Sequence, residues 1–364
     1  MVIYRGFDVL ESLMREVFTK NGVPEGDAGI CAEILIESDK RGIESHGVGR
    51  FKPIYIDRIR DGILNPVTKI DIVREGPTTA VLDGNDGMGH VIGKKAMETA
   101  IEKAGKLGMG MVAVRNSSHY GIAGYYATMA AKRGMIGITG TNARPSIAPT
   151  NGVEAMLGTN PLTFGIPTDE EFDFILDCAT SVTQRGKIEV YDREGKDVPS
   201  GWVIGRDGNG VTDINGMLSG LDKGELALTP LGGLGELTAG YKGYGYATVV
   251  EMLSAALAGG MFMKALNGKD EMGNKRPYGL GHFFIAIDVG AFIDIADFKK
   301  ATGDILRGLR ASERMPGCER IFTAGEKEYL YYTENRDRGV PLNDAMQGIL
   351  RGLIVEYGLK GYEI

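Results

Sequence analysis

Hydrophobic residues recur at helical spacing in the N-terminal part of the chain. The first such stripe is formed by Phe7, Leu10, Leu13, Met14 and Phe18. Two more segments continue the pattern, one beginning near Asp27 and one running over about 46–61. Because no strand-like run interrupts them, residues 1–70 are expected to form a helical unit.

From residue 70 onward, short β-branched runs alternate with amphipathic stretches. Strands are expected at 70–73, 79–82, 110–114, 136–141, 162–166, 174–177 and 282–288, and helices at 92–107 and 121–133. Such alternation predicts an α/β layer with parallel strand pairs. Residues 195–236 are rich in glycine, aspartate and proline and are expected to form an extended loop.

Helical patterns return near the C-terminus, at about 295–312 and 340–357. A chain of 364 residues is long enough for two or three domains. The predicted fold class is therefore α/β, with a helical domain formed by both chain ends, 1–70 plus 290–364. A central α/β domain covers 71–289.

Composition narrows the possible classes of protein. The net charge of −7 argues against a nucleic-acid partner, since duplex-binding proteins carry a basic face. Three scattered cysteines without a CxxC motif indicate a reducing compartment, and we expect a cytoplasmic protein.

The apolar run over 246–263 is interrupted by Glu251, which favours a buried helix over a membrane span. The 55 glycines indicate many tight turns and places of close backbone approach.

A glycine-rich turn over 83–90 lies where a dinucleotide fingerprint would stand, but its spacing is wrong. Gly87, Gly89 and Gly93 give GxGxxxG instead of GxGxxG, and the next strand carries no acidic residue at its end. A plain tight turn is the better interpretation. A nicotinamide cofactor would therefore be held in another way than in a Rossmann fold.

The segment 42–50 combines groups that suit a 2-oxo or 2-hydroxy acid. His46 and Arg50 are four residues apart and would share one face of a helix. They offer a general acid/base and a bidentate receptor for a carboxylate. Ser45 is a candidate N-cap of the same helix. The alternative is a surface histidine and a solvated arginine, and the residues alone do not decide between the two.

Polar residues also gather after the apolar run at 110–114, in the sequence Asn116-Ser117-Ser118-His119. In α/β folds, ligands bind at such strand ends. A helix cap accounts for a serine without any function. It accounts less easily for His119, so a functional role is favoured there.

Three loop regions are further candidates for binding. Asn142, Thr159 and Asn160 lie in loops beside strands, where Asx turns are the alternative. Asp177 ends a β run and either binds a ribose hydroxyl or caps a helix. Lys242 stands at the start of an apolar helix, where its charge opposes the helix dipole. A cofactor phosphate near Lys242 would explain its position.

Other chemistries find little support in the sequence. Four dispersed histidines without an HExxH or DxDxDG pattern give no metal-ligand set, and no metal site is predicted. A serine hydrolase is not indicated because GxSxG is missing. Cys178 as a nucleophile stays open, although an inert thiol is commoner.

Taken together and in order, these segments resemble the malate/L-lactate dehydrogenase family of non-Rossmann NAD(P)-dependent oxidoreductases. Its members act on malate, lactate, ureidoglycolate, sulfolactate, diketogulonate or cyclic imino acids. The matching segments are RGIESHGVGRF (41–51), NSSHYGIAGYY (116–126), GTNP (158–161), DCATS (177–181), GYKGYG (240–245), GHFFIAID (281–288) and MPGCE (315–319). The resemblance implies a homodimer with a helical domain made from both chain ends and an α/β cofactor domain of non-Rossmann topology.

The resemblance also implies roles for individual residues. Ser45, His46, Arg50 and Thr159 are expected in the substrate site, with Arg50 binding the carboxylate. Either His46 or His119 is the acid/base; both are kept and His46 is slightly favoured. The implied cofactor-binding positions are His119, Ala143, Asp177, Cys178, Ala179, Lys242, Gly243, Gly317, Cys318 and Glu319. The chain departs from many relatives at two of these positions: Cys178 stands where they have a methionine, and Ala143 stands where they have a hydroxyl residue, which removes one polar contact.

The expected reaction is reversible reduction of a small anionic 2-oxo acid, with malate or L-lactate as the hydroxy acid. NAD or NADP is the expected cofactor, with NAD slightly favoured. A histidine donates the proton while hydride goes to the carbonyl carbon. The alternatives are a cyclic imino-acid reductase, a ureidoglycolate- or sulfolactate-type dehydrogenase, and a nucleotide-binding sensor without chemistry. Neither a nucleic-acid partner nor a membrane is expected.

Overall fold

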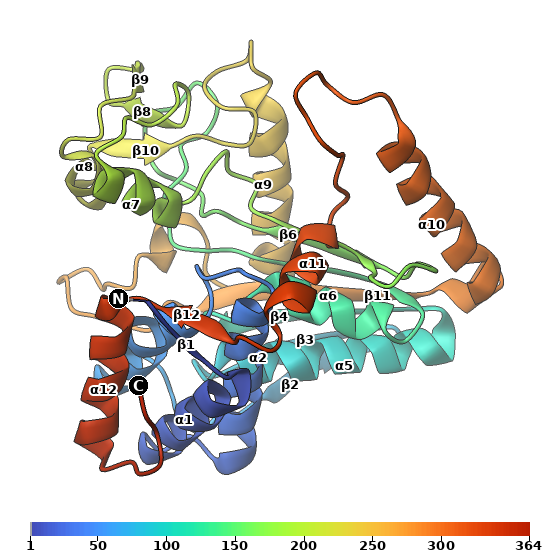
Figure 1. The fold of residues 1–364 in the computed structure, drawn as a ribbon, viewed down its shortest axis with the longest axis horizontal. Helices are drawn as coiled ribbons and strands as arrows, with labels where there is room; N and C mark the ends of the chain where they lie inside the picture. The colour runs from blue at the N-terminus through green and yellow to red at the C-terminus, as the bar shows by residue number, and fades with distance from the viewer. Residues whose placement is uncertain (1) are drawn as a thin grey trace.

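A seven-stranded sheet runs through the middle of the molecule (Figure 1). The computed structural model describes residues 2–364. In spatial order the strands are β2 (Asp71–Glu75), β3 (Thr79–Asp83), β4 (Met109–Ser117), β11 (Leu280–Asp288), β5 (Met135–Thr141), β6 (Leu162–Ile166) and β7 (Phe174–Cys178). Each strand predicted from the sequence is present, within a few residues at either end.

The strand directions differ from the predicted parallel pairs. Only β3 and β4 are parallel, and every other neighbouring pair is antiparallel. Two of the antiparallel pairs arise because β11 enters the sheet from far along the chain, between β4 and β5. The other antiparallel pairs, β2–β3, β5–β6 and β6–β7, join strands that follow one another in the chain. Phe284 lies opposite both Val112 and Thr139. The predicted strand–helix–strand units β3–α5–β4 and β4–α6–β5 are present, but in the second unit β11 lies between the two strands.

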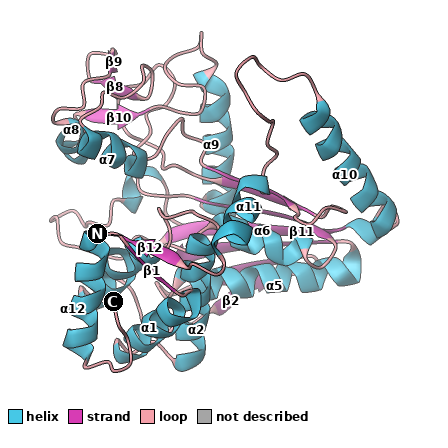
Figure 2. Cartoon of the chain, viewed as in Figure 1, coloured by secondary structure: helices cyan, strands magenta, loops and turns pink. Residues whose placement is uncertain are grey.

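Helices cover both faces of this sheet. On one face, α5 (Gly89–Leu107) and α6 (Ala123–Ala131) form a common core with β4 and β11, in which Ala100, Val114 and Phe284 are buried. On the other face, α9 (Gly240–Ser254) approaches so closely that a Cβ on Gly281 would lie 1.9 Å from the Ser254 carbonyl. The sheet is thus buried over its central strands (Figure 2).

The two chain ends pack together, as Figure 1 shows for both termini. Strand β1 (Ile3–Arg5) pairs antiparallel with β12 (Val340–Leu342). Helices α1 (Phe7–Lys20), α2 (Glu25–Lys40) and α12 (Asp344–Tyr357) share one hydrophobic core. Two other C-terminal helices, α10 (Ile295–Ala311) and α11 (Glu326–Asn335), lie outside this core.

The helix predicted over 46–61 is broken. It consists of α3 (Val48–Arg50), a π-helical turn η1 (Phe51–Ile56) and α4 (Asp57–Arg60). Pro53 lies inside the π-helical turn, and because proline has no N–H it cannot continue the α-helical hydrogen bonding. Aromatic and apolar side chains of this segment still reach the N-terminal core, as the residues Phe51, Tyr55 and Ile56 show.

The prediction of an extended loop over 195–236 is wrong, because short elements fold there around a core of their own. The elements within this range are β8 (Val203–Gly205), β9 (Gly210–Val211), α8 (Met217–Lys223) and β10 (Leu226–Leu228), and α7 (Arg185–Glu194) directly precedes it. Their buried side chains include Ile188, Val203 and Leu228. Glycines end these elements after only a few residues, which hid them in the sequence. The division of the chain into a helical domain (1–70 plus 290–364) and an α/β domain (71–289) stays a prediction. The core around Ile188, Val203 and Leu228 forms a third packing unit, which that division did not include.

The apolar run at 246–263 is not the single buried helix that was predicted. Helix α9 ends at Ser254, and short 3₁₀ turns follow at η2 (Ala256–Ala258) and η3 (Met263–Leu266). Tyr246, Val249 and Met252 on α9 are exposed. In the part of the chain that the structure describes, the helices are too short or too polar to cross a membrane.

Close contact between α5 and the loop after β4 gives a stability prediction. A Cβ on Gly89 would lie 2.3 Å from the Ser118 carbonyl and 2.5 Å from that of His119, both of which are backbone atoms. Gly89→Ala should therefore lower the free energy of unfolding by about 1–3 kcal/mol, the usual cost of overpacking. Urea denaturation measures this.

Gly105→Ala on the same helix is the matched control. A Cβ there meets only the end of Met135, at 3.6 Å. This variant should be neutral or stabilising by about 0.5–1 kcal/mol, because alanine favours helices over glycine. Equal effects of the two substitutions would contradict the packing described.

Candidate functional site

The turn after α2 carries Ser45, His46 and Arg50, and all three side chains are half-buried. Ser45 Oγ and His46 Nδ1 are 2.9 Å apart. The Nε of Arg50 donates to the Ser45 carbonyl at 2.7 Å, which fixes the guanidinium beside the histidine. The three residues predicted to act together are therefore brought together.

The predicted N-cap role of Ser45 is wrong, because Gly47 is the N-cap residue of α3 and the carboxylate that accepts the first helical amide comes from Asp39. The carboxylate of Asp39 accepts the Val48 amide at 2.8 Å. A Cβ on Gly47 would lie 2.2 Å from either carboxylate oxygen of Asp39, so only glycine permits this approach. Burial raises the pKa of Asp39 to about 7. His46 precedes α3, whereas Arg50 is its last residue. The two side chains therefore do not share one helix face, contrary to the prediction.

The second predicted histidine, His119, lies opposite the first. The rings of His46 and His119 are stacked with centroids 5.6 Å apart and an interplanar angle of 22°. They come from two distant segments, the turn after α2 and the loop between β4 and α6. His119 is also half-buried, so both rings keep some access to solvent.

A buried hydrogen-bonded chain lies behind His119. The hydroxyl of Tyr55 is 2.6 Å from His119 Nδ1 and 3.0 Å from His90 Nε2. The Gly121 amide also donates to His119 Nδ1, at 3.3 Å. Tyr55 and His90 are fully buried. Three of the four histidines of the chain are thus joined within one cluster.

This chain fixes the tautomer of His119. A backbone N–H can only donate, so Nδ1 of His119 is an acceptor and the neutral ring carries its proton on Nε2. Tyr55 then donates to His119 and accepts from His90. His46 is not fixed in this way, because the Ser45 hydroxyl can donate or accept. The two histidines are therefore chemically different.

Electrostatics keeps both histidines neutral in the free protein. Burial, and then the charge of Arg50, lowers the pKa of His46 to about 4. Burial also lowers the pKa of His119, and the neighbouring histidines, Arg58 and Arg50 add to this. A bound anion beside Arg50 would offset its charge and raise the histidine pKa values. The site thus couples proton affinity to the binding of an anion.

Several predicted residues lie at the ends of β5, β6 and β7: the cofactor positions Ala143 and Asp177–Ala179, and the substrate position Thr159. Ala143 lies against Gly158, where a Cβ would be 2.5 Å from the Ala143 carbonyl. The Thr159 carbonyl accepts from the Thr180 amide at 2.9 Å. Asp177 accepts from the Gly124 amide at 2.6 Å and stays exposed. Cys178 and Ala179, next to Asp177, are half-exposed.

The start of α9 carries Lys242, the lysine predicted to meet a cofactor phosphate. No side chain caps this helix of 15 residues, but the amides of Gly240 and Lys242 donate to the carbonyls of Gly235 and Ala239, at 3.1 Å and 3.0 Å. Lys242 makes no ion pair within residues 2–364 and lies near the Tyr241 ring. Gly243 allows α9 to pack on Leu231, since a Cβ would be 2.2 Å from its carbonyl. The Lys242 ammonium is therefore the group at this helix start that fits an anionic phosphate.

The segment 317–319 is not brought into this cluster by any contact in the described chain. It lies in the exposed loop between α10 and α11, where Gly317 has a positive φ of 83°. The Cys318 amide bonds only to the Met315 carbonyl, and Arg314 donates to the Glu319 carbonyl. A cofactor contact from Gly317, Cys318 or Glu319 remains a prediction.

Comparison with known proteins finds relatives over nearly the whole chain. The family description "Malate/L-lactate dehydrogenase" matches residues 6–350. The chain is 45% identical to malate dehydrogenase of Pyrococcus horikoshii over 354 residues, covering 97% of this chain and 95% of the relative. The protein belongs to the malate/L-lactate dehydrogenase family. The resemblance noted in the sequence is thereby confirmed.

Other relatives extend this family assignment. L-sulfolactate dehydrogenase of Methanocaldococcus jannaschii is 39% identical over 352 residues, which covers 96% of each chain. The crystal structure of malate dehydrogenase from Entamoeba histolytica has a TM-score of 0.96 and 44% identity, and covers 100% of both chains. The predicted class, an NAD(P)-dependent 2-hydroxy-acid dehydrogenase, is confirmed.

Sequence reasoning missed Tyr55, His90 and Asp39. Tyr55 stands among apolar residues of the segment 46–61, while His90 closes the glycine-rich turn at 83–90.

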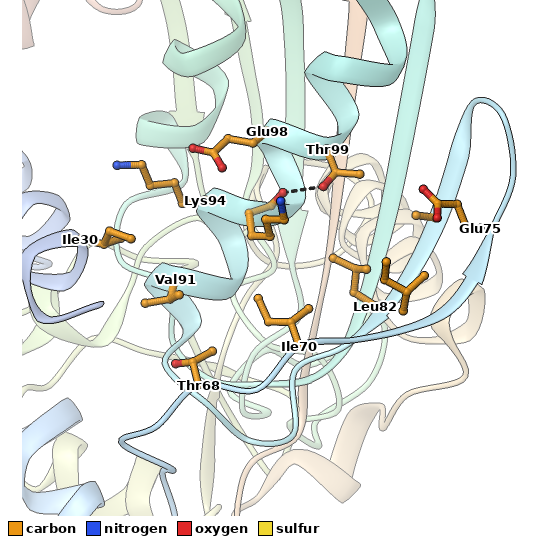
Figure 3. A pocket seen from close by; sticks show the side chains of 12 residues that line it. Ile30, Thr68, Ile70, Glu75, Leu82, Val91, Lys94, Glu98 and Thr99 are labelled. Carbon is orange, nitrogen blue, oxygen red and sulfur yellow. Dashed lines mark hydrogen bonds between the residues drawn. The ribbon is translucent and has the colours of Figure 1, made fainter. Parts of the chain in front are cut away.

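A cavity of about 420 Å³ between α2, α5 and the edge strand β2 is separate from the site (Figure 3). It is lined by Ile70, Leu82, Val91 and Lys94 among others, and by none of the predicted site residues.

The histidine electrostatics can be measured directly by NMR, because the chain has only four histidines. In the free protein, His46 should stay neutral until the pH falls to about 4. Burial should hold His90 and His282 neutral to about pH 3. Addition of a dicarboxylate should raise the pKa of His46.

In urea-unfolded protein the histidines should titrate near their ordinary value of about 6.5. His46→Asn assigns the resonance. A His46 pKa near that ordinary value in the folded, free protein would contradict the electrostatics described.

Proposed function

We propose that the protein interconverts malate and oxaloacetate with NAD or NADP as the second substrate, NAD being slightly favoured. The observation that carries the proposal is the neutral pair His46 and His119 beside the fixed guanidinium of Arg50. It is supported by the malate dehydrogenases among the relatives. An anion receptor next to a neutral base is what oxidation of a 2-hydroxy acid requires.

In this proposal Arg50 binds the carboxylate attached to the reacting carbon. Its charge is then offset, so protonation of a neighbouring histidine becomes easier at the moment that substrate is bound. Ser45 orients His46 through the Nδ1 contact, which leaves Nε2 of His46 free to take the hydroxyl proton of malate and to return it to oxaloacetate. His46 is thus the acid/base.

His119 has a different role in this proposal. Its Nε2–H, fixed by Tyr55 and Gly121, donates a hydrogen bond to the substrate oxygen and polarises the carbonyl in the reducing direction. Because that proton already occupies Nε2, neutral His119 is not a base toward the hydroxyl group.

The nicotinamide cofactor accepts or supplies the hydride when it is bound. Lys242 at the start of α9 would bind its phosphates. The loops at Ala143 and Thr159, together with the Asp177–Ala179 turn, would line the rest of the site. The absence of a Rossmann acidic residue leaves NAD and NADP both open.

A sulfolactate dehydrogenase is the second candidate, since a relative with that name is 39% identical over most of the chain. Lactate, ureidoglycolate and cyclic imino acids are further substrates to test.

We also propose a homodimer, because α9 and α10 expose apolar side chains: Tyr246, Val249, Met252, Ile305 and Leu309. A cytoplasmic location remains a proposal that rests on the scattered cysteines.

Separate replacement of the two histidines tests the mechanism. His46→Asn should lower kcat for malate oxidation by about 10²–10⁴-fold, the usual contribution of a general base. His119→Asn should cost less, about 10–100-fold, because only a hydrogen bond to the substrate is lost. Steady-state kinetics with NAD and NADP gives both values.

His282→Asn is the control for burial, since His282 is fully buried and bonded to Thr141 and Ser117, away from Arg50. Its kcat should change least when the folded protein is compared at a temperature well below its Tm. Near-normal turnover of His46→Asn would contradict the assignment of the base.

The homodimer is tested by placing charge on an apolar face. Met252→Arg and Ile305→Arg should each shift the sedimentation coefficient from dimer toward monomer. Lys20→Glu, on the exposed face of α1, should leave it unchanged. A wild-type chain that sediments as a monomer at micromolar concentration would contradict the dimer.

A further inference from the structure

One charged residue, Glu251, interrupts the apolar run over 246–263, and it lies buried inside the fold. It stands on α9 and is only 7% exposed. A cavity of about 310 Å³ lies beside it, and no basic residue of the described chain lines that cavity. A carboxylate taken out of water is costly unless hydrogen bonds replace the water. The groups that donate to Glu251 therefore show what it does.

Glu251 accepts hydrogen bonds from two loops. Its Oε2 accepts from Asn160 Nδ2 at 2.7 Å, and its Oε1 accepts from the Met263 amide at 2.8 Å. Asn160 Nδ2 also donates to the Ala247 carbonyl on α9, at 3.1 Å. Burial raises the pKa of Glu251, and the donors from Met263 and Asn160 act against this rise. Because an amide group has two protons, both protons of Asn160 are bound to α9.

The two residues that donate to Glu251 have backbone conformations that residues other than glycine rarely adopt. The angle φ is +34° at Asn160 and +46° at Met263. Such conformations persist only where the surrounding contacts hold them. Glu251 therefore holds two loops in shapes that they would not keep on their own.

The loop of Asn160 belongs to the predicted site. Asn160 follows Thr159, the predicted substrate residue, and is itself fully buried. Its carbonyl accepts from the Thr180 hydroxyl at 2.9 Å. Thr180 directly follows the predicted cofactor positions 177–179. One asparagine thus connects Glu251 to the substrate position and to the cofactor turn.

The segment held through Met263 reaches the loop after β5. The Met261 carbonyl accepts from Asn142 Nδ2 at 3.0 Å. Asn142 Oδ1 in turn accepts from the Gly281 amide on β11 at 2.8 Å. Asn142 is fully buried and precedes Ala143, a predicted cofactor position. Both asparagines that stood out in the sequence are therefore tied to the segment 247–263.

We propose that Glu251 is a positioning residue for hydride transfer. Its carboxylate holds the loops of Thr159 and Ala143 against α9, which sets the substrate carbon and the nicotinamide at reacting distance. It acts through Asn160 and Met263 and not by contact with the reacting atoms. A misplacement of about 1 Å can lower a rate by about 10²-fold. The inference rests on the proposed function, in which these loops line the site.

Glu251→Gln tests the inference because it keeps the shape of the side chain. Glutamine offers one acceptor oxygen where the carboxylate offers two. The backbone amide of Met263 can only donate, so the glutamine oxygen stays with it and the NH₂ group faces Asn160. The bond that holds Asn160 is then lost.

The measurement is a single turnover of NADH or NADPH in a stopped-flow instrument, with the enzyme in excess. The saturating acid is whichever of oxaloacetate, pyruvate and sulfopyruvate the wild type reduces fastest. The rate constant of Glu251→Gln should fall about 10–100-fold. The amplitude, which counts the folded sites, should stay near that of wild type. A merely structural role would lower the amplitude and leave the rate constant unchanged.

Asn160→Gly tests the same path independently, and remains informative even if Glu251→Gln does not fold. Glycine adopts a positive φ freely, so this variant removes the amide group without adding backbone strain. Its rate constant should also fall about 10–100-fold. The loss in the double variant should be smaller than the product of the two single losses, because both changes remove one contact.

Ser254→Ala is the matched control. Ser254 lies three residues further along α9 and is fully buried, and its hydroxyl has no hydrogen-bond partner among residues 2–364. Its rate constant should stay within about twofold of wild type.

A rate constant of Glu251→Gln within about threefold of wild type, with only the amplitude reduced, would overturn the inference and leave Glu251 a role in folding alone. An unchanged rate constant in Asn160→Gly, or an equal loss in Ser254→Ala, would also overturn it. A wild type that reduces none of the three acids would contradict the proposed function instead.

Discussion

The hydroxyl of Tyr55 is the contact on which the arrangement of the site depends. It joins the N-terminal helical core to the loop after β4 through His119, and to α5 through His90. Since all three groups have limited access to water, each hydrogen bond is hard to replace. The relative position of His46, on the helical side, and His119, on the sheet side, follows from this junction. So does the tautomer of His119.

Nearby positive charge decides the protonation state of the histidines and favours an anionic substrate. Burial and nearby arginines keep the histidines neutral, which suits proton removal from a hydroxy acid. The same arginines lack internal carboxylate partners in the described chain, so an anionic substrate completes the site electrostatically. Binding and proton affinity then rise together, because the substrate carboxylate offsets the charge that had lowered the histidine pKa. A neutral substrate would have neither effect.

Local patterns predicted the elements well, but not their assembly. The strand over residues 162–166 and the helix near 295–312 were found because their periodicity is local. The insertion of β11 between β4 and β5 depends on contacts between residues far apart in the sequence, such as Ile287 and Met109, which no local pattern predicts. Ser45, His46, Arg50 and His119 stood out as polar residues at turns. Tyr55 and His90 did not, because their role appears only when two packing units meet.

The central claim is that hydride passes between a nicotinamide and carbon 2 of a small 2-oxo acid held beside His46, His119 and Arg50. The most direct measurement uses NADH and NADPH doubly labelled with deuterium at nicotinamide C4, together with oxaloacetate, and analyses the product by NMR. The account predicts malate with one deuterium at C2 and unlabelled C3. Malate without deuterium at C2, or no malate from either cofactor, would contradict it.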